Sequence, residues 1–227
     1  MNKIRTIIAV AAMALTLMAT VLADAHAESS AKAEQLVVSA ELALQHFLGD
    51  PEMENLRALA KKARAVFIAP EVWEFGVGIG GSTGDGILLV RDKLSGKWLG
   101  PAFYTLDSGS LGIQFGVQVS EVVFLVMDQD SLYSLFLSSF NLGAGMSIAA
   151  GPVGKGAAVA TADIVSYSRS KGAYGGVSIT GGLLSVNLDL NRAYYGKGLD
   201  PVDILIRGPA RKKSMTVLSL VERLASQ

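Results

Sequence analysis

Apolar residues recur at every third or fourth position in two segments that follow residue 29, and this spacing predicts helices. The first segment runs from about Ser30 to Leu48, and its apolar positions are Leu36, Val37, Ala40, Leu44, Phe47 and Leu48. The second follows Gly49, because Asp50 is a suitable N-cap and Pro51 suits the first helical position. Its apolar stripe consists of Met53, Leu56, Leu59, Ala60 and Ala63. We therefore expect two consecutive helices.

The pattern changes from Ala65 to about Arg207, where glycine is frequent and apolar residues alternate with small or polar ones. The continuous apolar run Val122–Val126 predicts a buried strand. The alternation of Phe115, Val117 and Val119 with other residues predicts a half-buried one. Short strands separated by glycine turns favour a mostly antiparallel sheet, closed into a barrel-like form or packed as a sandwich.

Two further helices complete the α+β fold that we expect. One is short and internal, from Ser131 to Ser138, with Leu132, Leu135 and Phe136 directed inward. The other follows Gly208-Pro209 and the basic run Arg211-Lys212-Lys213, and its apolar face is formed by Val217, Leu218, Val221 and Leu224. This C-terminal helix either packs on the sheet or lies on a membrane surface. Four apolar side chains are few for stable interfacial binding, which favours packing.

The first 27 residues have the order of a secretory signal peptide. A basic start, Met1–Arg5, precedes the apolar stretch Ile7–Leu22, and Ala25-His26-Ala27 is a small-x-small cleavage triplet. The apolar stretch is too short for a convincing membrane span. We expect cleavage near Ala27 and export to the periplasm, with or without peripheral membrane association. The expected organisation is a signal peptide (1–27), a helical segment (28–64), a β-rich domain (65–208) and a C-terminal helix (209–227).

The charges of the chain are balanced, with 20 Lys and Arg against 20 Asp and Glu. Loss of the signal peptide removes Lys3, Arg5 and Asp24, which leaves one net negative charge. Such a balance gives no general attraction to nucleic acid, and attraction to an anionic membrane must be local.

The residues that most enzymes need are scarce. The chain has no cysteine, and His46 is its single histidine after the signal peptide, so nucleophilic triads and zinc sites have few ways to form. The sequence Gly76–Gly81 matches the G-x-G-x-x-G of dinucleotide-binding folds, but that motif must open a helix. Here Ser82–Gly86 is expected to form a turn before another strand. We predict a binding module without cofactor or metal, and not an enzyme.

Two basic groups are candidates for lipid contact. Lys61, Lys62 and Arg64 end the second expected helix, where favourable interaction with the helix dipole explains them equally well. Tyr167, Arg169, Lys171 and Tyr174 share a predicted strand and turn. Their cations could hold a phosphate head group, although a solvated hairpin explains them slightly better. The segment 191–197, with Arg192, Tyr194, Tyr195 and Lys197, has the same two interpretations.

The order of several short segments resembles the SYLF domain family, which is also found in yeast and animal actin-patch regulators. The resemblance extends from about His46 to Gly208 and is carried by Ala63–Pro70, the glycines of 76–86, Leu88–Arg91, Trp98 with Gly100–Phe103, Gly151–Gly154, Tyr167–Gly172, Tyr194–Gly196 and Ile204-Leu205. Glu74 departs from the basic or small residue that the family often has before Phe75-Gly76. The resemblance implies lipid binding, with a membrane contact in the helices before Val66.

The resemblance and the export signal together predict a lipid-binding module of the bacterial envelope. Its ligand is expected to be an anionic phospholipid or a phosphoinositide-like head group, and actin is not an expected partner of an exported chain. The alternative is a structural or protein-interaction domain without catalytic activity. A third possibility is an outer-membrane barrel, against which the helices and continuous apolar runs argue.

Overall fold

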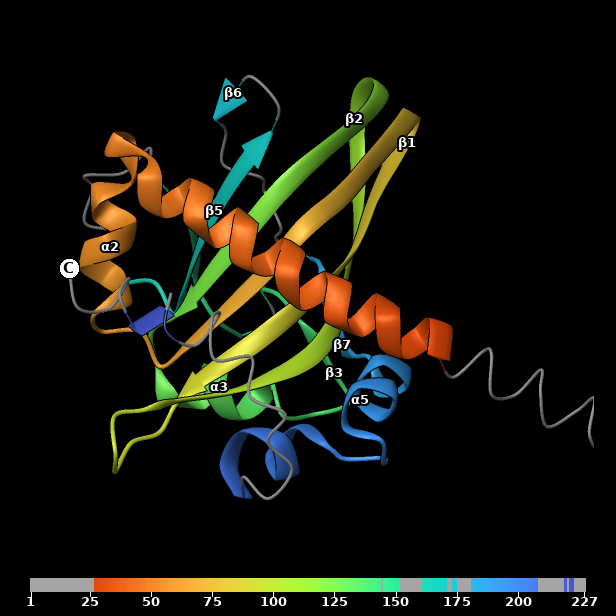
Figure 1. The fold of residues 1–227 in the computed structure, drawn as a ribbon. Coiled ribbons are helices and arrows are strands. Elements are labelled where there is room, and N and C mark those ends of the chain that lie inside the picture. Colours follow the sequence, from red (N-terminus) through yellow and green to blue (C-terminus); the bar gives the residue numbers. More distant parts are fainter. Residues whose placement is uncertain are drawn as a thin grey trace, which may run out of the picture.

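The computed structural model describes residues 27–143, 145–151, 161–170, 173–174, 181–207, 219 and 221–222. A long N-terminal helix (residues 27–49) is followed by a helical turn, η1 (Pro51–Met53), and by helix α2 (Glu54–Ala60). A curled, mostly antiparallel sheet follows, with short helices after it (Figure 1). This arrangement confirms the expected α+β class. The expected signal peptide lies outside the described residues, except for Ala27, which is helical.

Two very long strands, β1 (Ala65–Arg91) and β2 (Trp98–Val126), form the centre of the fold. They pair antiparallel along their whole length, from Ala65 opposite Val126 to Arg91 opposite Trp98. Our expectation of short strands separated by glycine turns was wrong for this region. The segment 82–86, which we interpreted as a turn, lies inside β1. No helix follows the G-x-G-x-x-G sequence, which is part of the same strand.

The long hairpin curls so that β1 approaches itself closely, and glycines allow this approach. A Cβ atom at Gly84 would lie 2.5 Å from the carbonyl oxygen of Glu71. A Cβ atom at Gly86 would lie 2.5 Å from the ring of Phe67. Both distances are shorter than real Cβ contacts, so no side chain fits at either position. The glycines that suggested turns therefore mark contacts between the two halves of one strand.

Shorter strands extend the sheet from the edge of β2 that does not pair with β1. Near the start of β2 lie β7 (Leu183–Val186) and then β3 (Ser139–Asn141), and near its end lies β5 (Ile164–Ser170). Strand β5 pairs in parallel with β4 (Ile148–Gly151) and antiparallel with β6 (Ala173–Tyr174). The β4–β5 pair is the one parallel pairing among the described strands.

Helices cover both faces of the sheet, so its strands contribute to two cores. Alternation along β1 sends Val66 and Ile68 to the helix-side core, and Phe67 and Ala69 to the opposite core. The helix-side core lies under the N-terminal helix, which crosses the sheet in Figure 1, and includes Ala40, Leu44, Phe47 and Leu56. The opposite core is covered by helix α3 (Gln129–Ser134) and the single-turn helix η2 (Asp203–Arg207), with Leu132, Leu135 and Leu205 buried.

The helices differ in detail from those expected. The internal helix is α3, which is capped by the carboxylate of Asp128 through the amides of Asp130 and Ser131. The α-helix after Pro51 begins only at Glu54, because residues 51–53 form the tighter turn η1 and Met53 takes the N-cap position. The structure adds helix α5 (Leu188–Tyr195), which we did not expect. In the C-terminal segment, Ser219, Val221 and Glu222 are helical, and Val221 is fully buried in the helix-side core.

We expect Gly86→Ala to lower the free energy of unfolding by about 1–3 kcal/mol, because the new methyl group must displace Phe67 and the Ile68 carbonyl. Denaturant unfolding measures this change. Gly109→Ala, in β2 of the same hairpin, is the control, since nothing lies within 4 Å of the added Cβ atom. Equal stability of both variants would contradict the close contact within β1.

Candidate functional site

A basic pocket lies where the two ends of β1 meet. It has a volume of about 210 Å³ and is lined by Lys62, Ala63, Arg64, Arg91, Asp92, Lys93 and Gly96. Lys62, Ala63 and Arg64 come from the segment after α2, and the other residues come from the end of β1 and the turn 92–97. The structure thus joins two of the cations predicted for lipid contact to two that the sequence did not single out.

Backbone and side-chain hydrogen bonds hold the two sides of this pocket together. The amide of Arg91 donates to the carbonyl of Arg64 at 2.8 Å, and the amide of Arg64 donates to the carbonyl of Val126 at 2.7 Å. The Arg91 guanidinium donates to the carbonyls of Lys61 at 2.9 Å and Gly96 at 3.3 Å. Arg91 therefore both supplies charge and fixes the end of α2 against the turn.

The turn 92–97 is ordered by the side chain of Asp92. One carboxylate oxygen accepts hydrogen bonds from the amides of Leu94 and Ser95 and from the Ser95 hydroxyl. The amide of Asp92 also donates to the carbonyl of Lys97 at 2.8 Å. Gly96 has a φ of 69°, which a side chain would disfavour. The carboxylate of Asp92, which lines the basic pocket, thus stabilises the turn.

The exposed cations of this region are available to an external anion. Lys61, Lys62, Arg64, Lys93 and Lys97 are exposed, and Arg91 is partly exposed. None of the ion pairs found among the described residues involves any of these six side chains. Several cations around a small concavity are suited to binding phosphate or carboxylate groups.

The structure describes Tyr167, Arg169 and the backbone of Tyr174 from the second predicted cluster. Tyr167 is fully buried in the helix-side core, where its ring packs over Gly151 and burial raises the pKa of its hydroxyl to about 12. Arg169 is on the sheet surface, 3.4 Å from one carboxylate oxygen of Glu121, whose other carboxylate oxygen lies 2.7 Å from Nδ1 of His46. The backbone of Tyr174 pairs with Arg169 in β6, and Lys171 lies outside the described residues.

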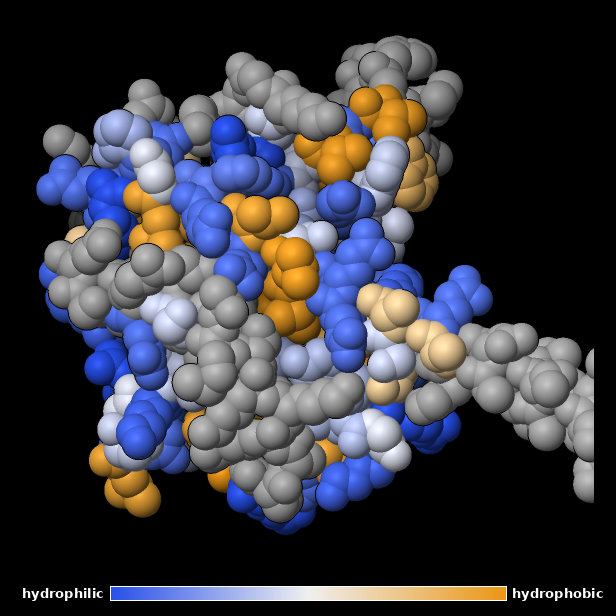
Figure 2. All heavy atoms as spheres, in the orientation of Figure 1, coloured by the Kyte–Doolittle hydropathy of each residue, from blue (hydrophilic) through white to orange (hydrophobic). Residues whose placement is uncertain are grey.

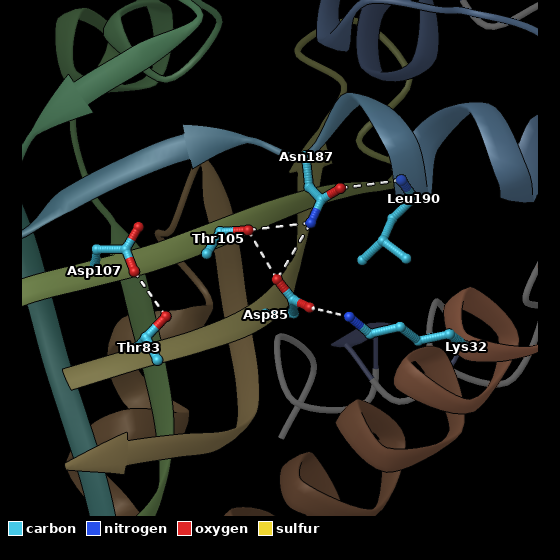
Figure 3. Close-up of polar contacts among 7 residues, drawn as sticks. All are labelled: Lys32, Thr83, Asp85, Thr105, Asp107, Asn187 and Leu190. Atoms are coloured by element: carbon cyan, nitrogen blue, oxygen red, sulfur yellow. Dashed lines mark hydrogen bonds and ion pairs between the residues drawn. The ribbon is translucent and has the colours of Figure 1, made fainter. Parts of the chain in front are cut away.

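A polar network ties the N-terminal helix, the hairpin and α5 together at another place (Figure 3). The carboxylate of Asp85 is 3.0 Å from the ammonium of Lys32, and accepts from the Thr105 hydroxyl at 2.8 Å and the Asn187 amide at 3.2 Å. The Asn187 side chain in turn caps α5 by accepting from the amide of Leu190. Because both oxygens of Asp85 have hydrogen-bond or ion-pair donors, this carboxylate links β1 to the N-terminal helix, to β2 and to the start of α5.

A groove of about 400 Å³ lies beside this network, between the N-terminal helix and β1. Its lining is mixed: Lys32, Gln35, Leu36, Ser39, Pro70, Glu71, Trp73, Thr83, Gly84 and Asp85. The single cation among these residues already pairs with Asp85. The groove therefore lacks the free positive charge of the basic pocket.

Asn191 has a structural role that the sequence did not reveal. It is fully buried on α5, and its side chain bonds the backbone of Phe103 twice, accepting from the amide at 3.0 Å and donating to the carbonyl at 3.1 Å. The helix ends at Gly196, whose φ is 71°. Residues 191–195 thus lie in a helix packed on β2, which corrects the hairpin interpretation of this segment, whereas lipid contact by the exposed Arg192 and Lys197 stays a prediction. Asn187 before the segment and Gly196 at its end were the available signals.

An exposed apolar surface lies in the middle part of β1 and β2, away from the basic pocket. It consists of Trp73, Phe75 and Val117, which are 49%, 55% and 71% exposed. Figure 2 shows hydrophobic side chains on this part of the hairpin and along the N-terminal helix, where Val38 and Leu42 are exposed. We call Trp73, Phe75 and Val117 the distal apolar surface. Neither β1 before Arg91 nor β2 contains a lysine or arginine.

Among the described residues, no three His, Asp or Glu side chains are grouped as metal ligands would be. Within the same part of the chain, no helix is both long and apolar enough to cross a bilayer.

Comparison with known sequences assigns the chain to a family. A sequence model of the Ysc84 family, described as "Las17-binding protein actin regulator", matches residues 107–227, more than half of the chain. The chain belongs to the Ysc84 family. This confirms the SYLF resemblance and places the chain in a family of binding and regulatory proteins. The matched segment begins within β2, so α2 and the turn 92–97 precede it.

Curated Ysc84 relatives are longer proteins from yeast and animals. LAS seventeen-binding protein 3 of Saccharomyces cerevisiae is 31% identical over 124 residues, which is 51% of this chain and 27% of the relative. Protein YSC84 of the same yeast is 30% identical over 144 residues, 60% of this chain and 30% of the relative. Human SH3 domain-containing YSC84-like protein 1 is 30% identical over 129 residues, which is 54% of this chain and 37% of the relative. The chain thus matches well under half of each relative.

Replacing Asn191 should be costly, because Asn191→Ala leaves the buried amide of Phe103 without this acceptor, while the Phe103 carbonyl keeps only the amide of Asn187 of its two donors from this region. We expect a loss of about 2–3 kcal/mol in the free energy of unfolding. Arg192→Ala, at the exposed neighbouring position of the same helix, should change stability by less than about 0.5 kcal/mol. Thermal or denaturant unfolding of the two variants compares them directly, and similar losses would argue against the role assigned to Asn191.

Proposed function

We propose that this chain is a module that binds anionic phospholipids and that the basic pocket is its head-group site. The observation that carries the proposal is the convergence of Lys62, Arg64, Arg91 and Lys93 on one small concavity. Phosphate oxygens accept hydrogen bonds from such cations, and the exposed side chains of Lys61 and Lys97 add positive charge nearby. The family resemblance implies the same class of ligand.

The absence of ion pairs at these cations supports the proposal in energetic terms. A cation that already pairs with a carboxylate must lose that partner before it binds a phosphate, as Arg169 would have to leave Glu121. None of the ion pairs found among the described residues includes a cation of the basic pocket, and the carboxylate in its lining, that of Asp92, accepts hydrogen bonds from the turn. Each near-surface lysine or arginine contributes about 1 kcal/mol of attraction to an anionic bilayer.

We further propose that the lipid is in the bacterial envelope. The proposal is supported by the signal-peptide order of residues 1–27 and places the mature chain in the periplasm, beside a membrane surface rich in phospholipid. Actin is not a partner in that compartment. Fractionation of cells that express the full chain tests this location, and recovery in the cytoplasm with an intact N-terminus would contradict it.

Vesicle co-sedimentation tests the head-group site. The purified protein should bind vesicles of phosphatidylcholine mixed with phosphatidylglycerol more tightly than phosphatidylcholine alone, and added salt should release it because exposed charges are screened. Lys62→Ala/Arg64→Ala/Lys93→Ala should weaken binding to anionic vesicles roughly a hundredfold, from about 1 kcal/mol per cation.

The control carries the same loss of charge elsewhere: Arg192→Ala/Lys197→Ala/Arg207→Ala, three exposed cations on or after α5 and on η2. We expect this variant to bind nearly as tightly as the unaltered protein. Equal weakening by both triple variants would mean that net charge, and not the basic pocket, governs binding. Equal binding to neutral and anionic vesicles would exclude the electrostatic site altogether.

The distal apolar surface favours a second candidate function, binding to another protein. Trp73, Phe75 and Val117 are exposed together, and the two strands that carry them have no lysine or arginine before Arg91. An apolar surface on strands without cations is better suited to a protein partner than to an anionic bilayer. The name of one yeast relative, LAS seventeen-binding protein 3, also describes binding to a protein. Failure of the pure protein to bind any vesicle, with loss of a co-purifying envelope protein in Phe75→Ser, would support this function.

A further inference from the structure

The turn beside the basic pocket presents a leucine to solvent. Leu94 is 98% exposed, more than any other large apolar residue in the described part of the chain. Figure 2 shows hydrophobic atoms protruding at the lower left, where the turn 92–97 lies in Figure 1. An isolated exposed leucine needs no explanation by itself. Leu94, however, lies at the edge of the basic pocket, on a turn that its own hydrogen bonds hold in place, and this position calls for an explanation.

The turn is ordered before any partner binds. Asp92 accepts from the amides of Leu94 and Ser95, and the amide of Gly96 donates back to the carbonyl of Asp92 at 2.9 Å. The Arg91 guanidinium holds the carbonyl of Gly96 from the side of the pocket. A residue that is already held in its binding conformation loses little conformational entropy when it is buried by a partner.

Cations surround Leu94 along the chain and across the pocket. Lys93 precedes it and Lys97 closes the turn, and both are exposed. Lys62 and Arg64 face the same turn across the basic pocket. Long basic side chains can keep their charge at the phosphate level while an apolar neighbour goes deeper. An apolar tip within a set of cations matches the layering of an anionic bilayer, with phosphates outside and acyl chains inside.

We propose that Leu94 is a membrane anchor that inserts into the acyl-chain boundary of an anionic bilayer while the surrounding cations contact head-group phosphates. The inference rests on the proposed phospholipid binding and adds a depth and an orientation to it. The turn 92–97 points into the bilayer, and the sheet stands above it. Binding then has one component that salt screens and one that salt does not.

A single label tests the insertion. Because the chain has no cysteine, Leu94→Cys creates a unique thiol for a polarity-sensitive nitrobenzoxadiazole label. With phosphatidylglycerol-containing vesicles, its emission should shift to the blue, and lipids with a nitroxide in the acyl chain should quench it. Leu137→Cys, at a leucine that is 61% exposed after α3, is the control and should show neither effect.

The outcomes separate the two proposals. If co-sedimentation shows that the protein is bound while the label at position 94 stays in a polar environment, the anchor is wrong and the phospholipid site stands. If the protein does not bind anionic vesicles, the proposed function fails and the anchor fails with it. Equal shifts at positions 94 and 137 would indicate adsorption without a preferred orientation and would also overturn the anchor.

Truncation of the side chain gives an independent measurement. Leu94→Ala removes three carbon atoms, and at about 0.8 kcal/mol for each buried carbon, partial insertion predicts roughly a tenfold or larger loss in vesicle partitioning. Leu137→Ala should change partitioning by less than about twofold. The loss in Leu94→Ala should be the same at low and moderate salt, because hydrophobic burial is not screened, whereas the effect of the triple cation variant should shrink. A Leu94→Ala loss that disappears with salt would contradict insertion.

Discussion

The structure depends on the curl of one long hairpin, and this curl depends on close contact between the two halves of β1. At Gly84 and Gly86 the strand lies against its own earlier residues, Val72 and Phe67, at distances that exclude a side chain. Since the strand returns to its origin, Arg91 at its end bonds to Arg64 just before its start. The curl also leaves both faces of the sheet to be buried, so the fold needs helices on each side and has two cores.

The basic pocket is a direct consequence of this closure. Lys62 and Arg64 are separated from Arg91 and Lys93 by nearly the whole of β1, yet all four line one concavity. Sequence patterns revealed the first group, because three cations after a helical stripe are visible locally. Sequence patterns could not reveal the second group, Arg91 and Lys93, because no local pattern indicates that a 27-residue strand returns to its starting point. Long-range strand pairing, and not a local motif, forms this site.

Periodicity was a better guide to the type of element than to its length. The 3.6-residue pattern predicted the N-terminal helix, α2 and α3, and alternation predicted the sheet. Glycine misled us because the same residue permits a turn, a bulge or a close contact, and only the packing against Phe67 and Val72 decides between them. Helix α5 was missed because it is short and polar on one side, although Asn187 and Gly196 have the residue types of its two caps. Burial of Tyr167 was equally hidden, since its neighbours in the sequence are polar.

Charge and apolar exposure are separated along the hairpin, and this separation makes the two candidate functions compatible. The cations gather where the hairpin closes, whereas Trp73, Phe75 and Val117 lie about ten residues along the strand, a distance of roughly 30 Å for an extended chain. A molecule seated on a bilayer through the basic pocket and Leu94 would direct the distal apolar surface away from the lipid. That surface would then be presented to water, where a protein can reach it. The proposed lipid binding at one end would therefore not compete with protein binding at the other, because each surface has the chemistry that its proposed partner requires.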